Sequence, residues 1–126
     1  MEKVRIETEK PFTVKELKKY LAEKFDIKVS KITTGTFLDR ARIFGHFVKD
    51  KKVKYDFDYI KKSGELVILK YYKVRYYRSA PAGYDNCVSS ISVLAETEQD
   101  AIEQAVAECS ALWGAERCSK FSIINR

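Results

Sequence analysis

Few side chains in this sequence have the types and spacing that catalysis needs. His46 is the only histidine, so a general base or metal ligand would have to be this single imidazole. Asp56 and Asp58 stand two residues apart, which on a strand places both carboxylates on one face, as in an acid and base pair. Their alternation with aromatic residues favours a simpler interpretation, the solvent side of a half-buried strand. We therefore expect no enzyme, and one dependent on His46 is the less favoured alternative.

Metal and cofactor chemistry is not indicated either. The three cysteines, Cys87, Cys109 and Cys118, are odd in number and lack the close pairing of a metal knuckle, so we expect reduced thiols. The segment from Thr33 to Thr36 could present backbone N–H groups to a phosphate. It lacks the glycine spacing and the lysine of a phosphate-binding loop, and a bulged strand is the better interpretation. We expect no cofactor and no metal.

Cations and tyrosines alternate in the middle of the chain, from Lys70 to Arg78, as in strands that stack bases while neutralising phosphates. On a period of two, Tyr71 and Tyr77 share a face with the two cations between them, and this face is the candidate surface. In the alternative, the tyrosines pack against the helices and the lysines form an ordinary polar rim. The residues predicted to bind nucleic acid or a partner are Lys15, Lys18, Lys19, Arg40, Arg42, Lys51, Lys52, Lys54, Tyr71, Lys73, Arg75 and Tyr77.

The elements that must position these residues follow from hydrophobic periodicity and helix-start signals. Thr13 and Glu16 have the spacing of a capping box, and Thr97 caps a second helix that should stop at Gly114. Strands are expected at residues 4–8, 27–37, 41–48, 53–59, 65–78, 88–95 and 121–124, and a loop at 79–86. The pattern predicts an α+β fold in the order β-α-β-β-β-β-β-α-β, with a mixed or antiparallel sheet. The long strand at 65–78 should bend or be shared by two sheet regions.

Length and charge define the broad class. The 126 residues suit a single compact domain, built from two abutting modules: a basic βαβββ at about 1–64 and a ββαβ at about 65–126. Residues 1–75 carry 20 Lys/Arg against 11 Asp/Glu, giving +9, whereas residues 76–126 carry 4 against 7, giving −3. A basic N-terminal surface could meet phosphates or an acidic protein. No apolar stretch approaches the ~20 residues of a membrane span and no signal-peptide core follows Met1, so we expect a cytoplasmic protein.

The C-terminal part resembles short modules of small phage and mobile-element proteins. The resemblance covers about 50 residues: a strand around Lys73 to Tyr77, a strand ending at Glu96, and an acidic helix start with an alanine-rich stripe from Thr97 to Ala105. Proteins of that kind include anti-defence factors such as inhibitors of CRISPR effector nucleases. The resemblance implies a stoichiometric inhibitor or modulator that binds nucleoprotein machinery. The strongly basic N-terminal part departs from the acidic, DNA-mimicking kind.

The sequence thus predicts a non-enzymatic binding protein, of the phage-encoded inhibitor or modulator kind, that acts on a nucleic-acid-handling complex. Direct binding of DNA or RNA by the same tyrosine-rich face is the alternative. The chain has neither a helix-turn-helix signature nor zinc-finger spacing, so no sequence-specific reading of DNA is expected. A homodimer also stays open, because exposed edge strands of a small α+β protein can pair.

Overall fold

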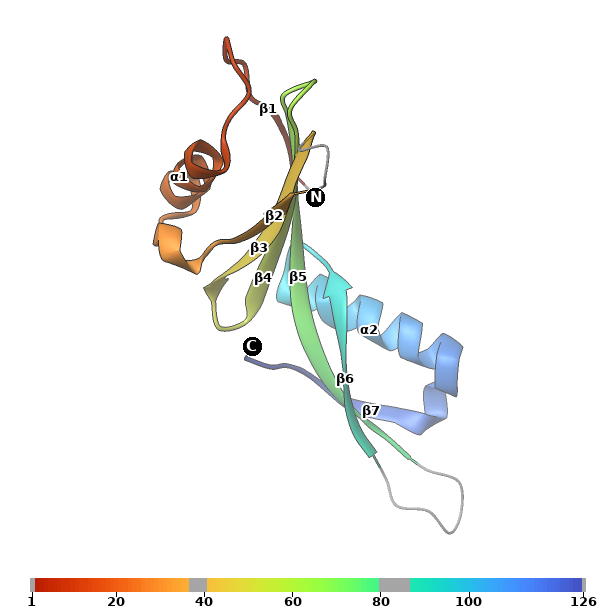
Figure 1. Ribbon diagram of the computed structural model, residues 1–126. Helices are drawn as coiled ribbons and strands as arrows, with labels where there is room; N and C mark the ends of the chain where they lie inside the picture. Colours follow the sequence, from red (N-terminus) through yellow and green to blue (C-terminus); the bar gives the residue numbers. More distant parts are fainter. Residues whose placement is uncertain (1, 37–40, 80–86, 126) are drawn as a thin grey trace. The chain divides into compact units, whose positions relative to one another are not determined.

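The computed structural model describes residues 2–36, 41–79 and 87–125 (Figure 1). The expected α+β fold is confirmed: two α-helices and a seven-strand antiparallel sheet follow one another in the order β-α-β-β-β-β-β-α-β. The predicted loop at 80–86 and the candidate residue Arg40 lie outside the described residues. The elements are β1 (Glu2–Arg5), α1 (Val14–Phe25), η1 (Val29–Lys31), β2 (Thr33–Thr36), β3 (Arg42–Asp50), β4 (Val53–Ile60), β5 (Glu65–Arg78), β6 (Cys87–Leu94), α2 (Glu98–Trp113), η2 (Ala115–Arg117) and β7 (Cys118–Ile123).

The chain divides into two compact units. Unit 1 comprises Met1–Asp50 and Lys54–Lys70, and unit 2 comprises Lys51–Val53 and Tyr71–Arg126. The division falls inside β5. Its first residues pair with β1, from Glu65 to Ile68, whereas β6 and β7 pair with its second half. This strand is therefore shared by two regions of sheet, as its length and composition predict.

Helix α1 of unit 1 starts where the capping signal predicts. The Glu16 N–H donates to the Thr13 hydroxyl (3.3 Å), and the Thr13 N–H donates back to the Glu16 carboxylate (3.2 Å). Both bonds satisfy N–H groups that a helix start leaves without partners. The helix ends at Asp26, which adopts a left-handed conformation with φ 53°. The caps thus fix where α1 begins and ends.

The core of unit 1 lies between α1 and one face of the strands ordered β1-β5-β4-β3-β2. Leu17 and Leu21 of α1 are fully buried there with Tyr59 of β4. Aromatic rings fill much of the space, and Phe25 lies 5.0 Å from Phe47 between ring centroids. Large apolar and aromatic side chains buried in this way supply most of the driving force for folding such a unit.

Two strand predictions in unit 1 are wrong in their extent. Residues 29–31 form the 3₁₀ turn η1, so β2 is confined to Thr33–Thr36. This turn brings Ile32 into the core, at the point where the alternation of the sequence loses its phase. The strand expected at residues 4–8 is instead β1, Glu2–Arg5. The chain then passes Gly64, whose carbonyl accepts from the Ile6 N–H (2.8 Å) and whose φ of 72° favours glycine.

Unit 2 consists of α2 and the antiparallel strands β6-β5-β7. The Asp100 N–H donates to the Thr97 hydroxyl (3.1 Å) and Gly114 follows the last helical residue, so both ends of α2 agree with the sequence pattern. Ala101, Ala105 and Cys109 are fully buried along one side of the helix, which contacts β6 and β7. Neither described helix is long and apolar enough to span a bilayer.

Candidate partner-binding surface

The second half of β5 separates its side chains into two faces. Tyr72, Val74 and Tyr76 are buried, the last with its ring stacked on Phe121 at 5.7 Å between centroids. The residues between them turn the other way: Tyr71 and Lys73 are half-buried, and Arg75 and Tyr77 are exposed. Successive side chains of a strand point to opposite sides, so the burial of Tyr72, Val74 and Tyr76 turns the other set outward. We call the side of the unit 2 sheet that carries Tyr71, Lys73, Arg75 and Tyr77 the outward face.

Neighbouring strands extend the outward face with small polar side chains and one more cation. Arg75 lies opposite Ser90 of β6 and Ser122 of β7. The Lys120 ammonium lies 4.9 Å from the centre of the Tyr77 ring, within the range of a cation–π contact. Lys120 reaches this position from an irregularity in β7, where its own φ is 56° and the pairing register with β5 shifts. Two tyrosines, three cations and flanking serines therefore share one side of a three-stranded sheet.

The cations of the outward face make no ion pair with any residue that the structure describes. Lys73, Arg75 and Lys120 are absent from its ion pairs. Arg78 is different, because its guanidinium lies 4.0 Å from the Trp113 ring and donates to the Cys87 sulfur (3.7 Å). The outward cations thus have their charge available for phosphate or carboxylate groups of another molecule, whereas Arg78 is held by its own unit.

The other predicted cations among the described residues lie on other elements of the chain. Lys15, Lys18 and Lys19 lie on α1 of unit 1, and Lys51 lies in the turn between β3 and β4. Three others neutralise carboxylates of the chain itself: Arg42 pairs with Asp58, Lys52 with Glu98 (3.2 Å) and Lys54 with Asp56 (3.7 Å). Hydrogen bonding to Asp58 raises the pKa of Arg42 above its usual value. Tyr71, Lys73, Arg75 and Tyr77 share one face of β5 within unit 2.

Among the residues that the structure describes, no hydrogen bond or ion pair joins the candidate catalytic groups to one another. His46 is exposed on β3, opposite Thr33 of β2. Asp56 and Asp58 are each engaged by the cations just named. Among the described residues no group of three or more His, Cys, Asp or Glu side chains could hold a metal ion. This part of the chain offers surface ion pairs, with no nucleophile beside a base.

The buried thiol of unit 2 is also poorly suited to nucleophilic chemistry. Cys109 is fully buried, and burial raises the pKa of its thiol above the ordinary value. The Cys118 thiol donates to the Cys109 carbonyl (3.7 Å). Because the thiolate is the reactive form of cysteine, a buried thiol with a raised pKa is inert at neutral pH. Cys109 therefore acts as a core residue.

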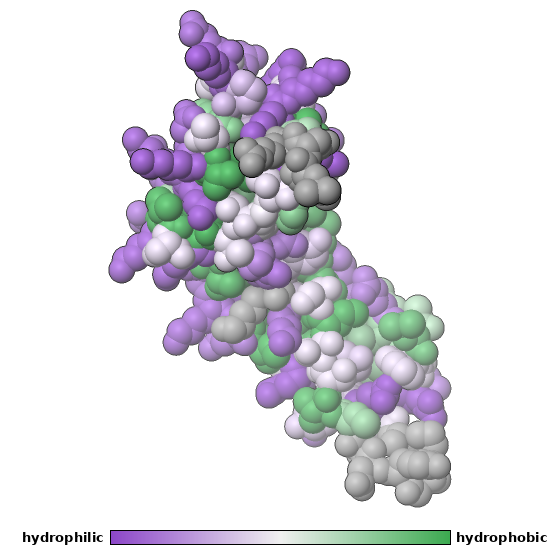
Figure 2. Space-filling view, viewed as in Figure 1, coloured by the Kyte–Doolittle hydropathy of each residue, from purple (hydrophilic) through white to green (hydrophobic). Residues whose placement is uncertain are grey.

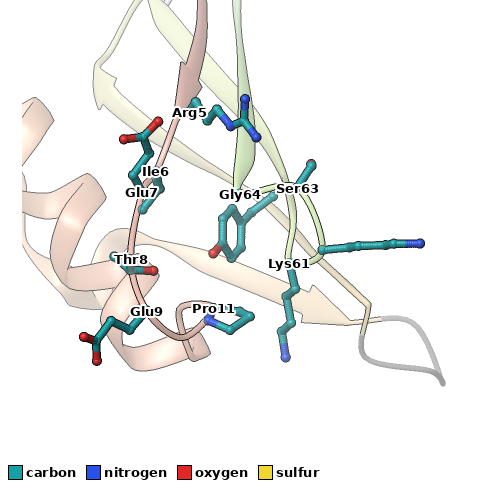
Figure 3. A pocket seen from close by; sticks show the side chains of 11 residues that line it. Arg5, Ile6, Glu7, Thr8, Glu9, Pro11, Lys61, Ser63 and Gly64 are labelled. Atoms are coloured by element: carbon teal, nitrogen blue, oxygen red, sulfur yellow. The ribbon is translucent and has the colours of Figure 1, made fainter.

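A groove of about 560 Å³ opens in unit 1 between the segment that follows β1 and the turn between β4 and β5 (Figure 3). Arg5 and Lys61 contribute positive charge to its lining, and Glu7 and Glu9 contribute negative charge. Figure 3 shows both carboxylates pointing away from Lys61. The lining combines both signs of charge and contains neither histidine nor cysteine. This groove has no chemical bias toward a particular ligand, so the outward face of unit 2 is the better defined candidate.

Exposed apolar side chains distinguish the surfaces of the two helices. The visible surface over α1 is mostly hydrophilic, whereas apolar residues emerge around α2 (Figure 2). Leu112 is 68% exposed and Val88 of β6 is 55% exposed. Isolated exposed apolar residues are common on proteins, but those on a sheet edge can contribute to strand pairing.

Sequence reasoning missed Lys120 and the serines of the outward face. Their place depends on which strands flank β5, and the pairing of β5 with β7 joins residues more than 40 positions apart in the chain, as between Arg75 and Ser122. Local alternation in β7 could have indicated a strand, but the irregularity at Lys120 interrupts it. Only the pairing register shows that Lys120 and Tyr77 are neighbours.

The fold and the outward face together define an α+β protein with a cationic, tyrosine-bearing sheet surface. No protein-family model, curated protein or solved structure matches the chain. Its binding chemistry is therefore argued from the residues of the outward face.

Proposed function

We propose that this chain is a non-enzymatic binding protein that docks the outward face of unit 2 onto a nucleic-acid-handling complex and modulates it. The observation that carries the proposal is the side-by-side arrangement of Tyr71, Lys73, Arg75 and Tyr77 on a face whose reverse side is sealed in the core. Tyrosine and arginine are enriched among residues that dominate binding energy at interfaces. A nucleoprotein surface offers the phosphates and carboxylates that such cations bind.

Rigidity of the support favours this role. The strand that carries the outward face pairs on both sides, since Arg75 has partners in β6 and β7 at once. Its alternate residues Val74 and Tyr76 are buried, so the backbone beneath the tyrosines is held in place. A surface that is already ordered loses less conformational entropy on binding than a mobile one does.

The resemblance of the C-terminal part to phage and mobile-element modules indicates the form that such a modulator would take. A stoichiometric inhibitor needs a docking surface and no catalytic residues, which suits the outward face. The excess of +9 over residues 1–75 argues against mimicry of nucleic acid, because a mimic must carry negative charge. Attraction to a negatively charged complex is the mode that we propose.

A second candidate function, direct binding of single-stranded DNA or RNA, is favoured by the alternation of rings and cations on one sheet face. Tyr71 and Tyr77 could each stack a base while Lys73 and Arg75 contact phosphates between them. Successive outward residues on a strand lie about 6.6 to 6.8 Å apart. That spacing is close to the separation of adjacent nucleotides in an extended single strand.

The decisive test compares two double variants that remove the same amount of positive charge. Lys73→Glu/Arg75→Glu alters the outward face, and Lys28→Glu/Lys31→Glu alters two exposed positions at η1 that are outside the predicted binding set. We expect affinity capture from the native host to recover a nucleic-acid-handling complex with the wild type and the η1 variant, and to lose it with the face variant. The purified complex should be inhibited in the same order. Equal capture and inhibition by the face variant would disprove the proposed docking surface.

A salt series separates the two candidate functions. Fluorescence anisotropy with single-stranded DNA, single-stranded RNA and duplex probes should show little binding at physiological salt if a protein interface provides the affinity. Direct phosphate binding would instead appear at low salt and weaken steeply, by about 10-fold or more between about 50 and 200 mM salt for a few phosphate contacts. Salt-sensitive binding that requires Lys73 and Arg75 would favour the second candidate.

A further inference from the structure

Strand β6 is an edge of the unit 2 sheet without the usual protection against pairing. Among the strands that the structure describes, it pairs with β5 alone, and all eight pairs from Cys87 to Leu94 follow one uninterrupted register. None of its residues is charged and none is proline. An edge strand of this kind presents a row of backbone donors and acceptors to any strand that lies beside it.

The opposite edge of the same sheet provides an internal contrast. β7 carries Lys120, and its register with β5 shifts between Arg75 and Tyr77. Charges and irregularities of this kind are the features by which edge strands avoid unwanted pairing. The sheet of unit 2 therefore has one edge protected in this way, β7, and one regular and uncharged edge, β6.

We propose that the β6 edge pairs antiparallel with β6 of a second copy of this chain, around a two-fold axis at Ile91. Val88, Ser90, Ser92 and Leu94 turn toward the outward face. An axis perpendicular to the sheet keeps these residues on the same side in both copies and places Val88 opposite the partner's Leu94, with Ser90 opposite the partner's Ser92. The strand is thus complementary to itself, and no charge opposes a like charge across the axis.

Other two-fold registers fit less well. A shift of one residue would place outward side chains opposite inward ones, which the burial of Val93 forbids. An axis at Ser90 would extend Leu94 beyond the start of the partner strand, and an axis at Ser92 would oppose Val88 to Glu96. The axis at Ile91 is the register that covers both exposed apolar residues of the strand, Val88 at 55% and Leu94 at 38% exposure.

This dimer does not depend on the proposed function, but it would enlarge the surface that the function uses. Joining two three-stranded sheets edge to edge produces a six-stranded sheet. The two outward faces lie on the same side of it, so the tyrosines and cations of both copies face one direction. A partner with repeated negative charge, such as a nucleic-acid strand or a nucleoprotein, could then contact both copies.

The register can be tested with a charge exchange in the full chain. Positions 88 and 94 are six residues apart, about 20 Å along one strand, so charges placed there interact only across the proposed axis. In Val88→Lys/Leu94→Lys each axis-related pair becomes two like charges. The matched variant Val88→Lys/Leu94→Glu makes each pair opposite in sign. Both sites are exposed, and circular dichroism melting verifies that each variant is folded.

Sedimentation equilibrium across a range of concentrations provides the measurement. We expect the wild type and the Lys/Glu variant to approach twice the protomer mass of 14.6 kDa, and the Lys/Lys variant to require at least a 10-fold higher concentration to do so. A wild type that stays at the protomer mass would overturn the dimer. Equal association of all three proteins would place the contact elsewhere, and weakening in both variants would refute the register. Protection of β6 amides from hydrogen exchange only on addition of a foreign partner would assign the edge to that partner instead.

Discussion

The buried hydroxyl of Tyr59 connects the start of α1 to the sheet of unit 1, and Tyr59→Phe tests that connection. The Tyr59 side chain is fully buried, and its hydroxyl accepts a hydrogen bond from the Phe12 N–H at 3.0 Å. Phe12 immediately precedes the capping residue Thr13. The substitution keeps the ring and removes one oxygen, so it isolates the hydrogen bond from the packing.

The magnitude follows from what the substitution leaves behind. A typical hydrogen bond contributes about 0.5–1.5 kcal/mol, and an unsatisfied buried donor costs about 1–3 kcal/mol. Phe12 is only half-buried, which allows water partial access to its N–H after the hydroxyl is gone. We therefore expect Tyr59→Phe to lower the free energy of unfolding of unit 1 by about 1–2 kcal/mol.

Urea unfolding followed by circular dichroism measures this change. With a slope of about 1–3 kcal/mol per molar urea, the midpoint should fall by roughly 0.5–1.5 M. Tyr20→Phe is the matched control, because Tyr20 also packs beside Phe12, with 5.9 Å between ring centroids, and none of the described hydrogen bonds uses its hydroxyl. The control should stay within about 0.5 kcal/mol of the wild type.

Two results would refute the reasoning. A midpoint for Tyr59→Phe equal to that of the wild type would mean that the Phe12 N–H is as well satisfied by water as by the hydroxyl. Equal falls in the urea midpoint of Tyr59→Phe and Tyr20→Phe would mean that removing any tyrosine hydroxyl from this region lowers the stability, and that the hydrogen bond to the Phe12 N–H has no effect of its own. Binding of the partner through unit 2 should be unaffected in either variant as long as the protein is folded.

Three further outcomes are expected. Gly45→Ala should lower the melting temperature by several degrees, because an added Cβ would overlap the Thr33 carbonyl oxygen and press on the Phe57 ring. Calorimetry that shows no change would contradict that close approach. Burial raises the pKa of the Cys109 thiol in the folded protein above the pKa of about 8.5 that a thiol has in an unfolded chain. The contribution of this thiol to the free energy of unfolding is therefore complete below about pH 8.5 and is lost as pH rises toward the pKa of the folded protein. Cys109→Ala should flatten this alkaline decline in urea midpoints, and an unchanged slope would assign the decline to other groups. Tyr77→Ala should weaken partner binding about 10-fold or more while Tyr77→Phe retains most of it, and equal losses measured by calorimetry would show that the hydroxyl, not the ring, makes the contact.

The fold could be predicted from the sequence wherever local signals agree. Both helix starts are local signals, because the hydroxyls of Thr13 and Thr97 accept hydrogen bonds from backbone N–H groups of the first turn. Gly114 marks the end of α2 in the same local way. The β-rich run that follows the turn at Ser63 and Gly64 correctly gives the bounds of β5. Prediction fails at residues 29–31, where the short turn η1 depends on bringing Ile32 into a core built from distant strands.

The candidate surface was predictable in part for the same reason. A period of two groups Tyr71, Lys73, Arg75 and Tyr77 without any knowledge of tertiary structure, but it does not say which face is outward. That choice depends on Val74 and its neighbours being covered, and on β6 and β7 flanking β5 on both sides. The ion pairs that occupy Arg42 and Lys54 also arise from strand packing, so a list of cations overestimated the number available to a partner.

The residue types between the buried positions of β5 change along the strand, whereas the alternation of buried and less buried side chains continues in both halves. In the first half, Leu66 and Ile68 are buried and the residues between them are apolar, whereas in the second half the residues between the buried positions are tyrosines and cations. Arg75 and Tyr77 are exposed and pack in no core, so their side chains are accessible to another molecule. The change coincides with the start of unit 2, where the flanking strands contribute serines and Lys120 to the same side. Under the proposed function, these outward side chains are the part of β5 that meets the partner, whereas Val74 and Tyr76 on its other side hold the strand against the core of unit 2.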